Sequence, residues 1–221
     1  MTGGEQGYYM YRTKSFIAGM ILITLLAGIG CGAGPAQTPV STPPEIPAGY
    51  TTYTDESQLF SISYPADWDM PMSQVPGLQQ KARETINDLK TGVAIQNTSV
   101  IFIAGLQAAQ GYEPNMNIGV EPAPIGINTH DQMVETVLGG FKTLSSGYKE
   151  VGRTKTTVDG REATIVSWES SVAGQKNLHF LQMYTMVDNV VWIVTCTATP
   201  ENFPRWENDF NTIVRSLRIS T

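Results

Sequence analysis

Apolar and polar residues follow different periods in successive segments of the chain. Residues 60–64 alternate between large apolar side chains and serine, a period of two that predicts a strand with one buried face. The continuous apolar run 100–104 predicts a central strand, and residues 116–120 predict another between Pro- and Gly-rich loops. These three segments predict the first half of a sheet.

Three segments repeat apolar residues at helical spacing instead. Residues 78–89 carry one apolar stripe and end before Gly92. Residues 133–141 carry a second stripe, introduced by Thr129 and Gln132 in the order of a capping box. We expect this second helix to stop near Gly147. Residues 203–217 carry the third, with a proline that a helix tolerates only near its start. The pattern therefore predicts three amphipathic helices.

Turn residues divide the segment between the second and third helices. Asp159-Gly160 is a strong hairpin signal, and it joins residues 154–158 to residues 162–169. Further turns are expected at Ala173-Gly174 and Asp188-Asn189. Four or more consecutive antiparallel strands with helices before and after predict an α+β fold. No Gly-rich loop joins a strand to a helix, so a parallel nucleotide-binding sheet fits poorly.

The first 30 residues have the pattern of an export signal, and they are excluded from the fold. Arg12 and Lys14 precede an uncharged, mostly apolar stretch that is short for a membrane span. The stretch ends in Gly28-Ile29-Gly30-Cys31. This segment resembles a bacterial lipoprotein signal, although Gly28 stands where an aliphatic residue is usual. The resemblance implies that residues 1–30 are removed and that Cys31 carries the lipid, with palmitate among its acyl chains. Met10 precedes a more usual signal start than Met1 does, and either can be the first residue.

Residues 31–49 predict a tether between the lipid and the domain. They contain repeated prolines and no apolar period, so the segment favours extended polyproline geometry. Its reach is on the order of 55 Å at about 3.1 Å per residue. The expected organisation is a signal peptide at 1–30, a lipidated cysteine and tether at 31–49, and one domain at 50–221.

Charge and cysteine content exclude several function classes. The net charge of −6 and the absence of a basic stripe make nucleic-acid binding improbable. Two cysteines cannot form a disulfide framework if Cys31 carries lipid. Cys196 then stands alone in an apolar run, which is typical of a small buried core residue.

The segment from Phe60 to Trp68 resembles the opening of PsbP-like domains. It contains Phe60, Ile62, Tyr64, Pro65 and Trp68 in the order F-x-I-x-Y-P-x-x-W. Residues 203–217 are similar to the closing helix of that family. The resemblance implies an antiparallel β-sheet flanked by helices, a PsbP-like α/β/α sandwich. It also implies a binding or assembly protein, because the family contains extrinsic photosystem II subunits and bacterial lipoproteins. The five motif residues are interpreted as core-forming.

Few residues suggest a metal site or a cofactor. The chain has two histidines, and neither belongs to a zinc-ligand spacing. His130 is interpreted as a solvated residue of a first helical turn, and His179 as a structural strand residue. Four acids occur near the first strand, and turn acids explain them better than a calcium loop does. No metal and no cofactor are predicted. The four acids are Asp55, Glu56, Asp67 and Asp69.

Catalytic signals are equally sparse. Glu162 and Glu169 share a predicted strand, and nothing in the sequence pairs them. Ser145-Ser146-Gly147 is interpreted as a helix terminus and not as a nucleophile elbow. Tyrosines in segments without periodicity remain as candidate partner contacts. These are Tyr50, Tyr53 and Tyr112.

We therefore expect a lipoprotein of the cell membrane, held on its extracytoplasmic face. The leading interpretation is a non-enzymatic binding or assembly module with an envelope protein as its partner. The first alternative is a lipoprotein that binds a small ligand or a cation. The second is a hydrolase with a dispersed active site.

Overall fold

The structure is a computed structural model that describes residues 45–69, 76–95, 97–106, 112–171 and 177–220. These residues contain three helices, α1 (Pro76–Thr91), α2 (His130–Leu144) and α3 (Phe203–Ser216). They also contain nine strands, β1 (Tyr50–Thr54), β2 (Phe60–Pro65), β3 (Ser99–Gly105), β4 (Asn115–Pro122), β5 (Ser146–Val158), β6 (Arg161–Ser171), β7 (Asn177–Val187), β8 (Val190–Ala198) and β9 (Arg218–Ile219). The predicted α+β class is confirmed.

The strands form two antiparallel sheets. The larger has the order β3-β4-β8-β7-β6-β5, and the smaller has the order β1-β2-β9. The prediction that residues 100–104 form a central strand is wrong, because β3 lies at the edge of the large sheet. Helix α1 packs against β3. An edge strand that a helix covers buries both faces, and it therefore has the continuous apolar pattern of a central strand.

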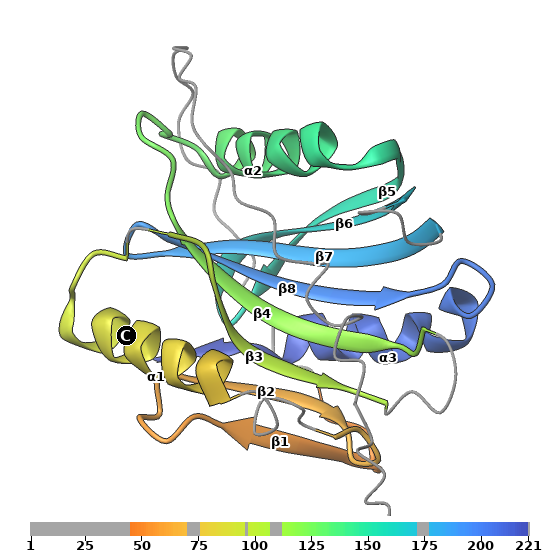
Figure 1. The fold of residues 1–221 in the computed structure, drawn as a ribbon, viewed down its shortest axis with the longest axis horizontal. Coiled ribbons are helices and arrows are strands. Elements are labelled where there is room, and N and C mark those ends of the chain that lie inside the picture. Colours follow the sequence, from red (N-terminus) through yellow and green to blue (C-terminus); the bar gives the residue numbers. More distant parts are fainter. Residues whose placement is uncertain (1–44, 70–75, 96, 107–111, 172–176, 221) are drawn as a thin grey trace, which may run out of the picture.

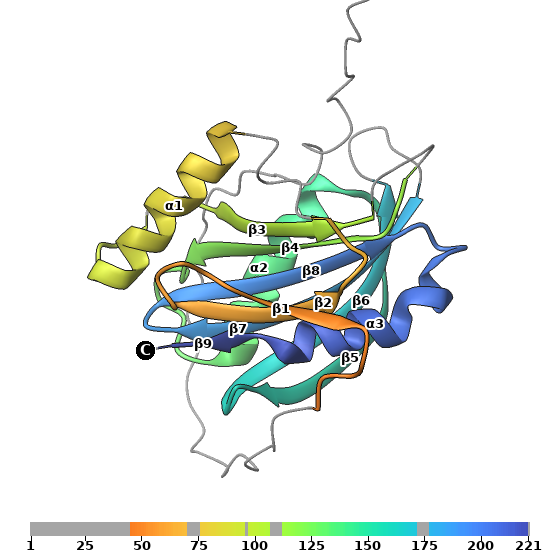
Figure 2. The same cartoon turned by 90° about the horizontal axis from the view of Figure 1, so that it is seen from below.

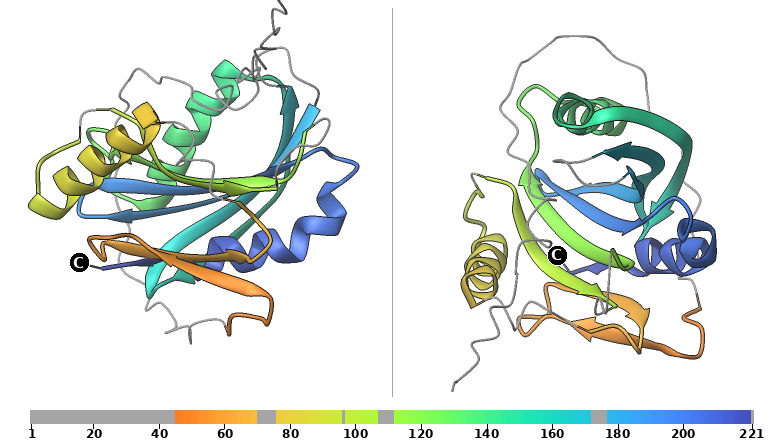
Figure 3. Two further views of the ribbon diagram at one scale, coloured as in Figure 1. Left: turned by 60° about the horizontal axis from the view of Figure 1, so that its bottom comes forward. Right: turned by 45° about the vertical axis from the view of Figure 1, so that its right-hand side comes forward.

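Each face of the large sheet is covered by different elements (Figure 1). Helix α2 lies on one face, whereas α3 and the small sheet lie on the other. Figure 2, seen from below, shows β1 and β2 in front of the large sheet and beside α3. The two views of Figure 3 show the same layers, with α2 and α3 on opposite sides of the curved sheet. The helices thus flank the antiparallel sheet on both faces, as predicted.

Two hydrophobic cores correspond to the two faces. The α3 side contains Phe60, Phe102, Trp192 and Phe210, all of them at most 2 % exposed. The α2 side is smaller and contains the stripe of α2 together with fully buried Trp168. Aromatic contacts link the small sheet to the large one, because the rings of Phe60 and Trp192 lie 5.9 Å apart.

The hairpin predictions are confirmed at both turns that the structure describes. Asp159 and Gly160 have φ values of 52° and 73°, and Asp188 and Asn189 have φ values of 49° and 61°. Two successive positive φ values match the right-handed twist of the flanking strands. The turn predicted at residues 173–174 lies outside the described residues.

Helix α2 starts where the capping box predicts. The Thr129 hydroxyl accepts a hydrogen bond from the backbone N–H of Gln132 at 3.2 Å. The helix ends at Leu144, earlier than the predicted stop near Gly147. Strand β5 then begins at Ser146 and runs for 13 residues, because Gly147 adopts a positive φ of 73° inside the strand region instead of ending the helix.

Candidate functional site

A cluster of polar side chains lies on the α3 face of the large sheet, near the end of β6 and the start of β7. Ser167 and Glu169 are two positions apart on β6, so they point to the same face. His179 on β7 is the direct cross-strand partner of Glu169. The register of one hairpin therefore brings a hydroxyl, an imidazole and a carboxylate together. We call Ser167, Glu169 and His179 the Ser167 cluster.

The imidazole stands between the other two groups of the Ser167 cluster. Its Nε2 lies 2.7 Å from Ser167 Oγ, which is a hydrogen bond. Its Nδ1 lies 3.7 Å from Glu169 Oε1, which is longer than a hydrogen bond and becomes an ion pair only when the imidazole is protonated. The other oxygen of Glu169, Oε2, lies 3.5 Å from Lys149 Nζ. The two ring nitrogens thus face chemically different partners.

Packing holds the ring of His179 in this orientation. The Phe203 ring, at the start of α3, stacks on it with centroids 3.5 Å apart and planes 5° apart. His179 is buried, at 8 % exposed, and this burial lowers its pKa, whereas Glu169 and then Glu207 act to raise it. Since desolvation is the largest cause, the histidine is held neutral to a lower pH than a free imidazole.

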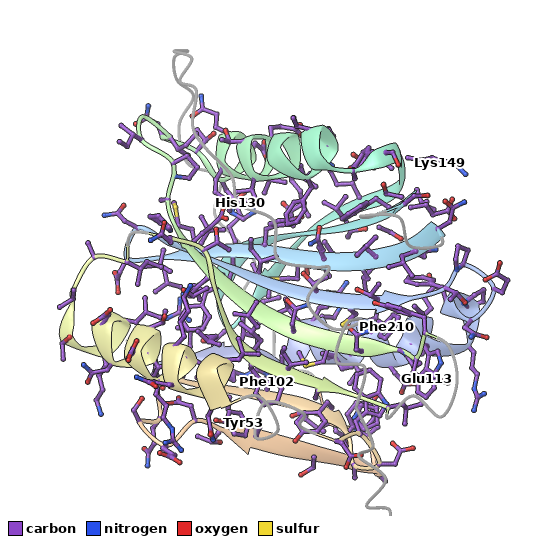
Figure 4. The ribbon with its side chains drawn as sticks, viewed as in Figure 1. Tyr53, Phe102, Glu113, His130, Lys149 and Phe210 are labelled. Atoms are coloured by element: carbon purple, nitrogen blue, oxygen red, sulfur yellow. The ribbon has the colours of Figure 1, made fainter. Side chains whose placement is uncertain are left out.

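The approach to Ser167 is open on the side of β5. Gly152 is the cross-strand partner of Ser167, and a Cβ placed on Gly152 would meet no atom within 4 Å. The pairing of β5 with β6 is irregular between Glu150 and Gly152, and such bulges reshape strands next to functional sites. Ser167 is half-buried. Figure 4 places Lys149, which is exposed, at the edge of the molecule.

His130 does not have the solvated environment that the sequence analysis predicts. It is the first residue of α2, as predicted, but it is buried and not solvated. Its Nε2 lies 3.0 Å from the hydroxyl of Thr164 on β6, and Figure 4 shows it between α2 and the sheet. Burial lowers its pKa, and Glu162 is the largest opposing influence. The role of His130 is to anchor the helix to the sheet.

The family motif forms core, as its alternation predicts. Its aromatic and aliphatic members are each at most 5 % exposed. Pro65 ends β2, and the Trp68 ring packs edge-on against Trp206 and Phe210 of α3. The buried members are Phe60, Ile62, Tyr64, Pro65 and Trp68.

The acids near the first strand do not gather. Asp55 is buried and accepts hydrogen bonds from the backbone N–H groups of Ser57 and Phe60, at 2.8 and 2.7 Å. It therefore shapes the turn between β1 and β2, whereas Glu56, Asp67 and Asp69 are exposed. Across the described segments, no three His, Cys, Asp or Glu side chains lie close enough to hold a metal ion.

The two strand glutamates point to opposite faces. Glu162 and Glu169 are seven positions apart on β6, and an odd separation on a strand reverses the face. They cannot act as a carboxylate pair. Glu169 instead joins His179, a pairing that only the register of β6 and β7 reveals.

The candidate contact tyrosines are engaged within the domain. The Tyr50 hydroxyl donates to the Asp209 carboxylate. The Tyr53 ring lies 4.6 Å from that of Phe102, and both residues are labelled in Figure 4. The Tyr112 hydroxyl accepts from Asn115 at 3.0 Å. Tyr50 links β1 to α3, Tyr53 packs the small sheet on the large one, and Tyr112 contacts the start of β4.

The predicted core role of Cys196 is confirmed. Its side chain is 0 % exposed on β8, and burial raises its pKa well above the ordinary value. A thiol in that state is a poor nucleophile. Cys31, the predicted lipidation site, lies outside the described residues. No helix among the described residues is long and apolar enough to cross a membrane.

Comparisons with known proteins identify the fold. No family model and no curated protein matches the chain. A Pseudomonas aeruginosa protein of unknown function, PA94, described as a putative regulator, has a TM-score of 0.51 at 18% identity, and the match covers 79% of this chain and 99% of that one. Cyanobacterial PsbP (CyanoP) from Synechocystis sp. PCC 6803 has a TM-score of 0.50 at 12% identity, over 79% and 94%. LpqN of Mycobacterium tuberculosis, described as involved in cell envelope biogenesis, has a TM-score of 0.48 at 14% identity, over 78% and 91%. The PsbP-like fold is thus confirmed.

Proposed function

We propose that the chain is a lipid-anchored binding or assembly module that works on the outer side of a cytoplasmic membrane. The observation that carries the proposal is the order of features at the N-terminus. A basic start, an apolar stretch, Cys31 and a Pro-rich spacer come immediately before the folded domain. Each feature alone is weak evidence for anchoring, but together they fit a lipid anchor, a spacer and a tethered folded domain.

The domain itself supports a binding role in two ways. Its fold resembles that of CyanoP, although a shared fold does not fix a function. The described domain also puts most of its large aromatic side chains into the two cores and directs most charged side chains outward, Asp55 and Glu121 being buried acids. A partner would then contact a surface of ordinary polarity, which is typical of complexes that form and separate.

The proposed partner is an envelope protein near the membrane surface. A tether with a reach of about 55 Å confines the domain to a thin layer next to the membrane. Confinement raises the effective concentration toward partners in the same membrane. Binding of this kind needs no catalytic step.

In-cell crosslinking followed by affinity capture and mass spectrometry tests the proposal. A Cys31→Ala strain is the matched control, because it removes the lipid site and leaves the domain unchanged. We expect one envelope protein to be recovered with the original chain and to be depleted with the variant. If no protein is enriched although the chain is abundant and lipidated, the partner proposal fails. A rise in melting temperature with a small ligand or a cation would then favour the alternative of a ligand-binding lipoprotein.

A further inference from the structure

The Ser167 cluster has the arrangement of a nucleophile, a base and an orienting group. Such sets are recognised by geometry and roles, and they recur on unrelated folds. Ser167 Oγ lies 2.7 Å from His179 Nε2, within the reach expected of a nucleophile and its base. Glu169 lies 3.7 Å away at the other ring nitrogen, Nδ1. The order serine, histidine, glutamate along this contact chain matches a hydrolytic triad.

We propose that Ser167, His179 and Glu169 form a nucleophilic triad that hydrolyses carboxylic esters through an acyl group on Ser167. Ser167 and His179 are the catalytic residues, and Glu169 is a positioning residue. This activity is independent of the tether and of the envelope partner. It takes up the alternative of a hydrolase with a dispersed active site and departs from the expectation of a non-enzymatic chain.

The environment of His179 suits a general base. A base must be unprotonated at the working pH, and the burial that lowers the pKa of His179 keeps the ring neutral. Its Nε2 then accepts the Ser167 proton, while Nδ1–H faces Glu169. Stacking on Phe203 restricts rotation of the ring, so the two nitrogens keep their partners.

The surroundings of Ser167 leave room for an acyl group. Gly152, on the neighbouring strand, has no side chain that would cover the Ser167 hydroxyl. The space where a Gly152 side chain would stand is open. Lys149 reaches the same face and is paired with Glu169. Its ammonium, 3.5 Å from Glu169 Oε2, is the cation that the proposal assigns to the tetrahedral oxyanion.

The reaction follows from these positions and is balanced with the ester and water alone. Ser167 Oγ forms a bond to the carbonyl carbon while its proton passes to His179 Nε2. The ester C–O bond then breaks, and His179 returns the proton to the departing alcohol. A water molecule, deprotonated by the same nitrogen, then attacks the acyl carbon. The bond from that carbon to Ser167 Oγ breaks, His179 returns the proton to Oγ, and the carboxylic acid leaves.

Covalent labelling of the detergent-solubilised full chain tests the triad. The probe is a fluorescent fluorophosphonate, which phosphonylates activated serines, and p-nitrophenyl butyrate serves as the ester. We expect one phosphonylated residue, Ser167, when the labelled chain is digested and analysed by mass spectrometry. No labelling, or labelling at another residue, would overturn the proposal, because a merely structural hydrogen bond does not activate the hydroxyl.

Variants of the cluster sharpen this test. Ser167→Ala should abolish labelling, and His179→Gln should slow it by about 100-fold or more. Ser171→Ala is the matched control, because Ser171 is a half-buried serine on the same strand and face without a histidine contact. Circular dichroism verifies the fold of each variant. Labelling that survives Ser167→Ala, or that is lost equally in Ser171→Ala, contradicts the proposal.

The pH dependence of the labelling rate distinguishes a positioning role of Glu169 from a merely structural one. The charged groups that influence His179 are Glu169, Glu207 and Lys149. We expect the labelling rate to fall at low pH as His179 becomes protonated. Glu169→Gln removes the largest influence that raises the pKa of His179, so the acidic midpoint should move to lower pH. An unchanged midpoint would exclude Glu169 from this role.

Discussion

The large sheet carries two polar clusters, one on each face, and they differ in their access to solvent. On the α2 face, Gln182 accepts a hydrogen bond from Trp168 Nε1 at 2.7 Å and one from the Tyr184 hydroxyl, and it donates to Thr195 at 3.0 Å. Gln182 is 1 % exposed. On the α3 face, the Ser167 cluster ends in side chains that solvent reaches. We call the first set the Gln182 cluster.

The comparison shows how similar hydrogen bonds serve different purposes. A sealed polar network contributes to a unique core, because each member left without a partner costs free energy. The Gln182 cluster meets that condition under α2 and cannot contact a ligand without unfolding. The Ser167 cluster lies where α3 begins and where β5 carries a glycine, so its hydroxyl remains accessible. Access distinguishes a candidate site from core.

The largest effect is expected from Trp168→Ala. The Trp168 ring is buried and stacks on Phe180 with centroids 4.0 Å apart. Loss of this ring should lower the free energy of unfolding by about 3–5 kcal/mol, as measured by urea denaturation. Trp206→Ala is the control, since Trp206 is only half-buried and should cost less. Equal losses would show that the α2 face is not sealed as described.

A smaller loss is expected from Gln182→Leu. The change removes the acceptor of two buried donors, the Trp168 indole N–H and the Tyr184 hydroxyl. An orphaned buried donor costs about 1–3 kcal/mol, so stability should fall although leucine is more apolar. Urea denaturation measures this loss. A neutral or stabilising result would mean that water reaches the network.

The two histidines should make the domain acid-sensitive from both faces. Burial lowers the pKa of His130 and of His179, so the folded state favours their neutral forms. Their contribution is present above the unfolded pKa of about 6.5 and is lost as the pH falls through that value toward the lower folded pKa. Stability measured from pH 7.5 to pH 5 should therefore decline. The decline should be shallower in His130→Gln and in His179→Gln, and a slope that neither variant changes would refute this linkage.

Ser167→Ala should separate reactivity from stability. The Ser167 hydroxyl makes one hydrogen bond in a half-open place, so its loss should cost about 0.5–1.5 kcal/mol. Labelling by the fluorophosphonate should nevertheless disappear. If urea denaturation shows a loss of several kcal/mol in the free energy of unfolding, Ser167 belongs to the sealed core. The two clusters would then not differ in their access to solvent.

The smallest effect on stability belongs to Lys149→Met. The ion pair with Glu169 is mostly exposed on the lysine side, and exposed pairs contribute about 0–1 kcal/mol. The labelling rate should fall, because the cation that the proposal assigns to the oxyanion is removed. Lys155→Met is the matched control, since Lys155 is an exposed lysine on the same strand and pairs with Asp131. If both variants label equally fast, Lys149 has no part in the chemistry.

Local periodicity was enough to predict most of the elements. The alternation at residues 60–64, the stripe of α3 and the turns at Asp159 and Asp188 each reflect contacts between residues close in sequence. The small sheet was not predicted. It needs β9, a strand of two residues, to pair with β2 from the far end of the chain. So short a segment has no period of its own.

The Ser167 cluster was beyond sequence reasoning for a similar reason. Glu169 was a candidate because of its strand, and it was compared with Glu162, which points to the other face. His179 was judged structural because no spacing pairs it with a ligand. Only the register of β6 with β7 shows that Glu169 faces His179, and the side chains show that Ser167 lies within reach. The register of this hairpin depends on where each strand begins and ends, and composition does not show those positions.

The central claim is that the domain is exported and held at the membrane by Cys31, and the mass of the mature chain tests it most directly. The chain would be extracted from membranes of its native host and analysed intact by mass spectrometry. We predict a chain that begins at Cys31 and carries acyl chains, and that stays with the membrane in a high-salt wash. A chain that retains residues before Cys31, or that begins later and washes off without lipid, would contradict the anchored-module account.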